Sequence, residues 1–219
     1  MTSRLLQLLI DSFLQILIPG LLVTIPLTIL SFVFGLIIAI GTAMVQIANI
    51  SILKQLARFY IWIVRGTPLL VQLYVIFYGL PSLGVVLDAF PSAVLVFSVN
   101  TGAYAAETIR ASIESVPKGQ MEAGYTVGMS FSQIMRRIIL PQAIRVAFPP
   151  LSNTLISLVK DTSLAANITV LEMFMKTQQI AARTYEPFAL YFEVGLIYLL
   201  FSTILTKLQT YGEKKLAVY

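Results

Sequence analysis

The segment Glu114–Pro150 reads ESVPKGQMEAGYTVGMSFSQIMRRIILPQAIRVAFPP and is a charged, helix-patterned island in an otherwise apolar sequence. Pro117 has the fixed φ angle that suits the first turn of a helix, and Gly128 supplies the left-handed residue that often ends one. The run Ser130–Gln133 matches the capping box, in which serine and glutamine each bond the other's backbone N–H. The segment therefore predicts two short helices with a bend at Gly128, with Arg137 in the last turns of the second.

The composition of the whole chain indicates an integral membrane protein. Of its 219 residues, 58% are hydrophobic and only 11% are charged, and the mean hydropathy is +0.86; soluble domains are about a quarter charged. The net charge of +5 does not indicate nucleic acid, because the basic residues flank apolar runs instead of forming one patch. The chain has no cysteine and no histidine, which excludes disulfides, thiolate catalysis and the commonest metal ligand.

The apolar runs predict an all-α, polytopic protein with five transmembrane helices in a single domain. From Ser12 to Leu53 there is no charged residue. As one helix this run would measure about 63 Å, twice the roughly 30 Å hydrocarbon core. We therefore expect a change of direction near Pro19-Gly20 or Pro26, after an interfacial amphipathic helix over 2–18. The expected spans are 20–45, 59–80, 92–109, 147–166 and 188–206, with polar connections over 46–58 and 171–187 and a hairpin over 114–142 outside the bilayer.

The basic residues predict the orientation of these spans. Five spans place the termini on opposite sides, and we expect the N-terminus outside and the C-terminus in the cytoplasm. The hairpin is then cytoplasmic, and the positive-inside rule is satisfied. The basic residues expected inside are Lys54, Arg58, Arg110, Lys118, Arg136, Arg137, Arg145, Lys207, Lys214 and Lys215. Those expected outside are Arg4, Lys176 and Arg183.

The hairpin carries a spaced motif: Glu122-Ala123-Gly124, three residues, Gly128, nine residues, Ile138, one residue and Leu140-Pro141. This pattern resembles the EAA loop of ABC importer permeases, with Gly124 in place of the second alanine. The smaller glycine preserves close packing and lowers helix propensity by roughly 1 kcal/mol. The resemblance implies that the residues Glu122, Ala123, Gly124 and Gly128 form a coupling helix that contacts an ATP-hydrolysing subunit. The alternative is an amphipathic hairpin that lies on the lipid headgroups.

The resemblance extends over nearly the whole chain. The runs RGTPLLVQ (65–72), NTGAYAAET (100–108) and SLVKDTSL (157–164) resemble the polar amino acid branch of these permeases. The run FPPLSNTLISLVKDTSLAA (148–166) is most similar to cystine permeases. The resemblance implies a type I importer fold in the bacterial inner membrane, a second permease subunit, identical or not, a cytoplasmic ATPase dimer and an extracytoplasmic solute-binding protein. ATP and Mg²⁺ would be bound by the ATPase, so no cofactor is expected in this chain.

Polar residues within the apolar spans are the candidate substrate ligands, because a charge in the bilayer is expensive unless it is paired or faces water. Arg65 lies beside a Gly-Thr-Pro break, where it could bind an α-carboxylate with two parallel hydrogen bonds; alternatively it snorkels to the headgroups. Asp161 could bind an α-ammonium; alternatively it forms an interhelical salt bridge. The six candidates are Arg65, Thr67, Gln72, Asn100, Asp161 and Thr162. By contrast, we expect Glu107 and Arg110 to form a structural pair.

Two other functions compete with the permease. An ion-gradient-driven secondary amino acid transporter would need an inverted repeat or a second half, and neither is evident in this chain. A membrane enzyme of lipid metabolism would lack histidine, cysteine and clustered carboxylates, so we expect a transporter subunit and not an enzyme. Gly119–Gly124 has the glycine spacing of a phosphate loop, but Tyr125 stands where the lysine is required. The mixed charges of Arg65 and Asp161 suit a neutral amino acid such as cystine or glutamine.

Overall fold

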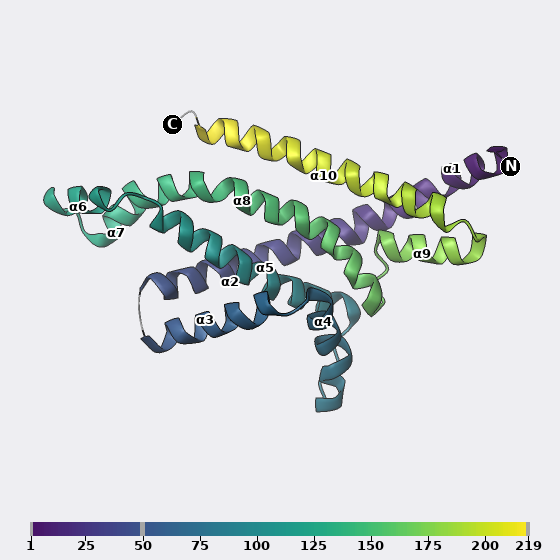
Figure 1. Cartoon of the computed structure of the whole chain (residues 1–219), viewed down its shortest axis with the longest axis horizontal. Coiled ribbons are helices and arrows are strands. Elements are labelled where there is room, and N and C mark those ends of the chain that lie inside the picture. The colour runs from purple at the N-terminus through teal and green to yellow at the C-terminus, as the bar shows by residue number, and fades with distance from the viewer. Residues whose placement is uncertain (1, 49–50, 218–219) are drawn as a thin grey trace.

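The computed structural model describes residues 2–48 and 51–217, which are helical almost throughout and contain no strand. Figure 1 shows long helices that run side by side along the longest axis of the molecule. The all-α prediction is confirmed. The α-helices are α1 Thr2–Pro19, α2 Ile25–Ile47, α3 Ser51–Gly66, α4 Leu69–Tyr74, α5 Ala89–Glu114, α6 Lys118–Thr126, α7 Phe131–Ile134, α8 Leu140–Asp161, α9 Met173–Thr184 and α10 Pro187–Ala217.

Three to five segments of the described chain are long and apolar enough to cross a membrane. Three are single runs, Ser3–Ile47, Ala89–Glu114 and Pro187–Leu216. Two more are bent pairs: Ser51–Gly66 with Leu69–Leu83, bent by 105°, and Phe131–Ile168 with Met173–Thr184, bent by 54°. The chain is therefore a multi-pass membrane protein. The expected ranges 20–45, 92–109 and 188–206 lie within the single runs, whereas 59–80 and 147–166 fall on the bent pairs.

The first apolar run does not change direction as the sequence suggested. A π-helical turn, Gly20–Thr24, joins α1 to α2, and the result is one helix of 45 residues from Ser3 to Ile47. In this turn the Ile25 N–H donates to the Gly20 carbonyl, five residues back. Pro26 has no N–H to give to the normal helical bond, and the wider turn carries the backbone past it without a break.

The prediction of a short second helix in the hairpin is wrong for the same reason. A π-helical turn, Met135–Ile139, joins α7 to α8, and the Leu140 N–H donates to the Met135 carbonyl. The helix thus passes Pro141 and continues to Asp161. The local predictions for this hairpin are confirmed: Gly128 has φ +77°, and Ser130 and Gln133 make both bonds of the capping box.

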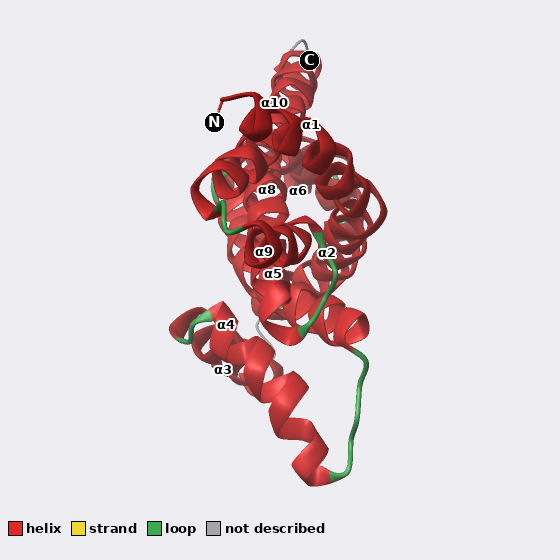
Figure 2. Cartoon of the chain, turned by 90° about the vertical axis from the view of Figure 1, so that its right-hand side faces the viewer, coloured by secondary structure: helices red, strands yellow, loops and turns green. Residues whose placement is uncertain are grey.

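The predicted break at Arg65–Pro68 is also confirmed. Pro68 is extended, with φ −63° and ψ 137°, and the chain turns by 105° into an arm formed by α4 and the two helical turns that follow it, up to Leu83. Figure 2 shows this arm set apart from the main bundle. A straight second span over 59–80 is therefore not present, because proline removes the N–H that would continue α3.

The centre of the fold is the contact between α2 and α5, which is the most extensive interhelical contact in the described chain. A Cβ atom at Gly35 would lie 2.8 Å from the Thr101 Cβ, and one at Gly102 would lie 2.8 Å from Ile38. Small residues here allow the two backbones to approach closely, as in other membrane helix pairs. The Tyr60 hydroxyl on α3 donates to the Val99 carbonyl of α5 at 2.6 Å, which fixes α3 beside this pair.

A second cluster forms where α1, α9 and α10 meet, at the end of the molecule that carries the N-terminus in Figure 1. Residues buried in it include Ile16 from α1, Met173 from α9 and Leu190 from α10. The sequence treated 171–187 as a polar connection, but α9 occupies most of it. Met173, Ile180 and Ala181 are buried, and so is Thr177, whose hydroxyl donates to the Met173 carbonyl. Tertiary packing accounts for this helix.

Candidate functional site

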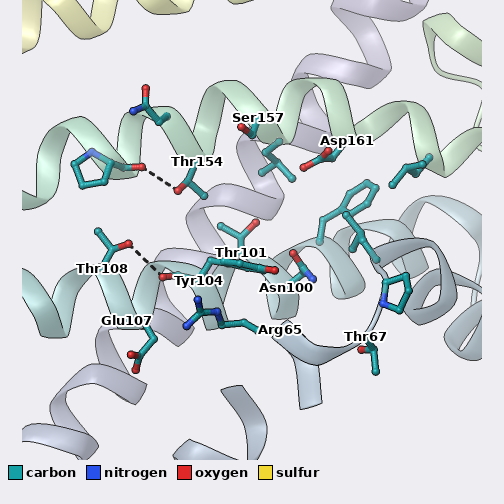
Figure 3. A pocket seen from close by; sticks show the side chains of 17 residues that line it. Arg65, Thr67, Asn100, Thr101, Tyr104, Glu107, Thr108, Thr154, Ser157 and Asp161 are labelled. Carbon is teal, nitrogen blue, oxygen red and sulfur yellow. Dashed lines mark hydrogen bonds between the residues drawn. The ribbon is translucent and has the colours of Figure 1, made fainter. Parts of the chain in front are cut away.

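A polar cavity of about 690 Å³ lies between α5, α8 and the break that separates α3 from α4. Figure 3 shows side chains from all three elements pointing into it. Charged side chains at its rim are Arg65, Glu107 and Asp161. The other polar residues that line it are Thr67, Asn100, Thr101, Tyr104, Thr108, Asn153, Thr154 and Ser157.

Two helical faces supply most of these side chains. On α5 the lining positions are Asn100, Tyr104 and Thr108 with their neighbours, and on α8 they are Asn153, Ser157 and Asp161 with theirs. Spacings of three and four residues place side chains on one face of a helix. Sequence reasoning singled out the amide and the charges and missed Tyr104, Asn153, Thr154 and Ser157. The polar stripe at helical spacing was the signal that would have found them.

Arg65 is one of the residues that line the cavity. It is the last residue but one of α3, and its guanidinium carbon lies 5.1 Å from the centre of the Tyr104 ring on α5. This contact is within the range of a cation–π interaction, which orients the guanidinium without using its N–H donors. Those donors stay available for a ligand, because Arg65 forms no ion pair within the described chain.

Gln72 does not line the cavity but contacts two residues that do, Thr67 and Asn100. Its amide nitrogen donates to the Val64 carbonyl at 2.8 Å and to the Thr67 hydroxyl at 2.9 Å. Its amide oxygen accepts from the Asn100 side chain at 3.1 Å. Gln72 thereby ties both sides of the Gly-Thr-Pro break to α5 and orients Asn100, whereas Asn100 and Thr67 themselves line the cavity. Gln72 itself is not among the residues that line the cavity.

Asp161 ends α8 at the rim of the cavity and is half-buried. No side chain or backbone group within the described chain makes a hydrogen bond or ion pair with its carboxylate. The neighbouring Lys160 is exposed and is not among the lining residues, as expected for adjacent positions on a helix. An interhelical salt bridge for Asp161 within this chain is therefore excluded for the described residues.

Thr162 does not lie in the cavity, contrary to the prediction. Its side chain is 0% exposed and its hydroxyl donates to the Val159 carbonyl at 2.6 Å. The α-helix gives way after Asp161 to the 3₁₀ segment Thr162–Ile168. This tighter winding turns Thr162 into the interior, a change that helical periodicity along α8 did not indicate.

Glu107 and Arg110 form the ion pair that the sequence predicted. The Arg110 Nη2 lies 2.8 Å from the Glu107 Oε2, and its Nη1 lies 2.5 Å from the Glu114 Oε2. Gln46 from α2 adds a hydrogen bond to Glu107 at 3.2 Å. Glu107 is thus held in an ion pair, whereas Arg65 and Asp161 are charged residues of the cavity that form no ion pair within the described chain. The described part of the chain holds no group of three acidic side chains placed to bind a metal ion.

The hairpin outside the spans offers a second candidate surface on α6. Glu122 and Ala123 are exposed, whereas Gly124 is buried against α7. A Cβ atom at Gly124 would lie 2.6 Å from the Ile134 Cγ1, so an alanine would not fit there without movement. The glycine that departs from the EAA pattern is thus explained by the close contact of the two hairpin helices.

Known proteins resemble this chain over nearly its whole length. The L-cystine transport system permease protein TcyB of Bacillus subtilis is 52% identical over 210 residues, which are 95% of this chain and 90% of TcyB. The probable amino-acid ABC transporter permease protein PatM of Vibrio harveyi is 44% identical over 84% of each chain. The solved structure of an amino acid ABC transporter with histidines superposes with a TM-score of 0.88 at 33% identity, covering 94% of this chain and 96% of the other.

The family model for the binding-protein-dependent transport system inner membrane component matches residues 31–218. This match covers most of the chain, from the middle of α2 to its end. It includes every element that lines the polar cavity and the whole hairpin that carries the EAA-like motif. The chain therefore belongs to the family of inner membrane components of binding-protein-dependent transport systems.

Proposed function

We propose that this chain is the permease subunit of an importer for a polar amino acid, L-cystine, and that the cavity between α5 and α8 is where the amino acid binds. The observation that carries the proposal is the pair of opposite charges, Arg65 and Asp161, on facing walls of one polar cavity, neither of which forms an ion pair within the described chain. A zwitterion presents the complementary pair. The name and 52% identity of TcyB support cystine as the amino acid.

The arrangement of the cavity supports a role for each residue. Arg65, oriented by Tyr104, binds an α-carboxylate with two parallel hydrogen bonds. Asp161 binds an α-ammonium, and Asn100 and Thr67 supply neutral hydrogen bonds. Cystine has a second zwitterionic end, and Asn153 and Ser157 on α8 are two of the remaining polar groups of the cavity, which we assign to it.

The hairpin supports a coupling role for α6. Glu122 and Ala123 are exposed and make the contact with a cytoplasmic ATPase dimer, which binds ATP and Mg²⁺. Gly124 and Gly128 shape the hairpin, one by close packing and one by its positive φ. Closure of the ATPase dimer then moves α6 and, through the continuous helix from α7 to α8, the wall of the cavity that carries Asp161.

The complete transporter contains a second permease subunit and an extracytoplasmic solute-binding protein. We place the N-terminus outside the bacterial inner membrane and the C-terminus in the cytoplasm. Two features support this orientation: the N-terminus and the hairpin lie at opposite ends of the molecule in Figure 1, and α10 ends toward the hairpin. Lys214 and Lys215 at that end agree with the positive-inside rule.

Uptake of radiolabelled cystine into cells, with and without the ATPase subunit and with excess glutamine, arginine or glutamate, tests the proposal. We expect uptake that requires the ATPase, resists the competitors and falls in Arg65→Ala while ATP hydrolysis and assembly persist. Glu122→Arg is expected to detach the ATPase without affecting membrane insertion. Uptake that persists without the ATPase would indicate the ion-gradient-driven carrier instead, and ATPase-dependent uptake of another amino acid would discard cystine alone.

A further inference from the structure

A second polar pocket, of about 330 Å³, lies outside the transport cavity, at the end of the molecule nearest the hairpin. It is bounded by the end of α2, by α3 from Lys54 to Trp62 and by the second half of α5. Its lining holds three cationic side chains, Lys54, Arg58 and Arg110, and two carboxylates, Glu107 and Glu114. The pocket therefore carries one positive charge in excess.

Arg110 bonds both carboxylates, at 2.8 and 2.5 Å, so these three groups together carry one negative charge. Lys54 and Arg58 on α3 carry two positive charges, which leaves the excess of one. On that helix Arg58 is exposed and forms no hydrogen bond or ion pair within the described chain. Lys54, one turn earlier on the same face, lines the pocket beside it. The pocket thus has the chemistry to receive one monovalent anion.

The surroundings of the pocket are apolar and open. Trp62 lines it and is 70% exposed, and the Phe59 ring, 57% exposed, lies 6.0 Å away. Leu56 and Ile52 continue this exposed apolar face along α3. In a membrane protein such a face contacts acyl chains, and an exposed tryptophan marks the level of the headgroups. A small soluble anion would not contact this apolar face, whereas a lipid would cover it with its acyl chains.

We propose that this pocket binds the phosphodiester of an anionic phospholipid. The Arg58 guanidinium, assisted by Lys54, bonds the phosphate oxygens, and the acyl chains lie along Trp62 and Phe59. Basic pockets between transmembrane helices bind anionic headgroups in this way. One phosphodiester carries a single negative charge, which equals the excess charge of the pocket.

The place of the pocket suggests a consequence for the hairpin. Lys54, Glu114 and Gln46 also line a neighbouring cavity that reaches Glu122 on α6. A bound lipid would hold the start of α3 against the end of α5, directly before the chain enters α6. The lipid is thus expected to stabilise the base of the hairpin.

The protein contains its own probe, because Trp62 is the single tryptophan of the chain. The test uses the full chain in vesicles of phosphatidylcholine with increasing amounts of brominated phosphatidylglycerol, whose bromine atoms quench tryptophan fluorescence on contact. Brominated phosphatidylcholine is the reference lipid. We expect about a fivefold preference for phosphatidylglycerol, the effect of one basic residue near a membrane surface.

Arg58→Gln should abolish the preference, and Arg58→Lys should retain part of it. Lys214→Gln, which removes an exposed charge from α10 at the same end of the molecule, is the matched control and should change nothing. Equal quenching by both lipids, or an unchanged preference in Arg58→Gln, would refute the proposal. Relief of quenching by millimolar inorganic phosphate would show a site for soluble anions, and relief on adding the ATPase subunit would show a protein contact; either result would overturn the lipid assignment.

Discussion

Two regions of this protein hold carboxylates in opposite ways. Where α9 and α10 meet, Glu172 is 0% exposed, and its oxygens accept hydrogen bonds from the backbone of Phe174 and Met175 and from the Tyr198 hydroxyl, at 2.7–2.9 Å. At the cavity, Asp161 is half-buried and accepts none from the described chain. A buried carboxylate whose bonding capacity is filled from within serves the fold. One whose capacity is open is available to a ligand.

The largest expected effect is that of Asp161, the carboxylate without a bond in the described chain, on transport. Asp161→Asn removes the charge that meets the ammonium group, and a hydrogen bond to a charged group is worth about 1.5–3 kcal/mol. We expect cystine uptake in proteoliposomes of the complete transporter to fall roughly 30- to 100-fold, with thermal unfolding of the purified protein unchanged. Normal transport by this variant, or loss of its folded state, would show that Asp161 does not serve as a ligand group and that the contrast with Glu172 is wrong.

For Glu172, whose oxygens are bonded within the protein, we expect the reverse: a loss of stability without a loss of transport. Glu172→Ala removes the N-terminal cap of α9 and the acceptor of Tyr198, and we expect the free energy of unfolding to fall by about 2 kcal/mol. Transport by the protein that remains folded should be unaffected. Denaturant titration in detergent micelles measures the first effect and uptake per folded molecule the second. Glu186→Ala, at an exposed acidic residue beyond the same helix, is the control.

Two glycines of α6 in the hairpin differ in packing in the same way: Gly124 is in close contact with α7 and Gly119 is not. Gly124→Ala places a methyl group against Ile134, and overpacking of this kind costs about 1–3 kcal/mol, of which about 1 is returned by better helix propensity. We expect a net loss of about 1 kcal/mol in unfolding titrations, and a smaller additional loss from Ile134→Val in the Gly124→Ala background than in the parent protein, because the shorter side chain relieves the contact. Gly119→Ala, on the same helix with nothing within 4 Å of the added atom, should be neutral or slightly stabilising. Equal behaviour of the two alanine variants would contradict the packing argument.

The smallest effect concerns Glu193, which is 8% exposed and accepts the Ser12 hydroxyl at 2.6 Å. Ser12→Ala leaves this carboxylate without its donor from α1, and we expect a loss of about 1 kcal/mol. A double-variant cycle with Glu193→Gln isolates the pair, because the coupling energy then excludes effects of either residue alone. A coupling energy near zero would show that the bond to Ser12 does not stabilise the fold, and Glu193 would then resemble Asp161 more than Glu172.

Family comparison aside, the sequence alone predicted the features that depend on neighbouring residues. The break at Pro68, the left-handed Gly128, the capping box at Ser130 and the pair of Glu107 with Arg110 are all present. Each is decided by the allowed backbone angles or by contacts within four residues. Composition likewise indicated a membrane protein, because the free energy of burying charge in lipid depends on residue type more than on fold.

The tertiary structure decided the rest. Two π-helical turns carried the chain past Pro26 and Pro141, and α9 formed in a stretch that is polar on average. Which side chains enter the cavity also depended on how α5 and α8 face each other: Tyr104 and Ser157 line it, whereas Thr162 is turned away by a change of helix type. These outcomes depend on contacts between segments far apart in the chain, whose free energy no local pattern of residues contains.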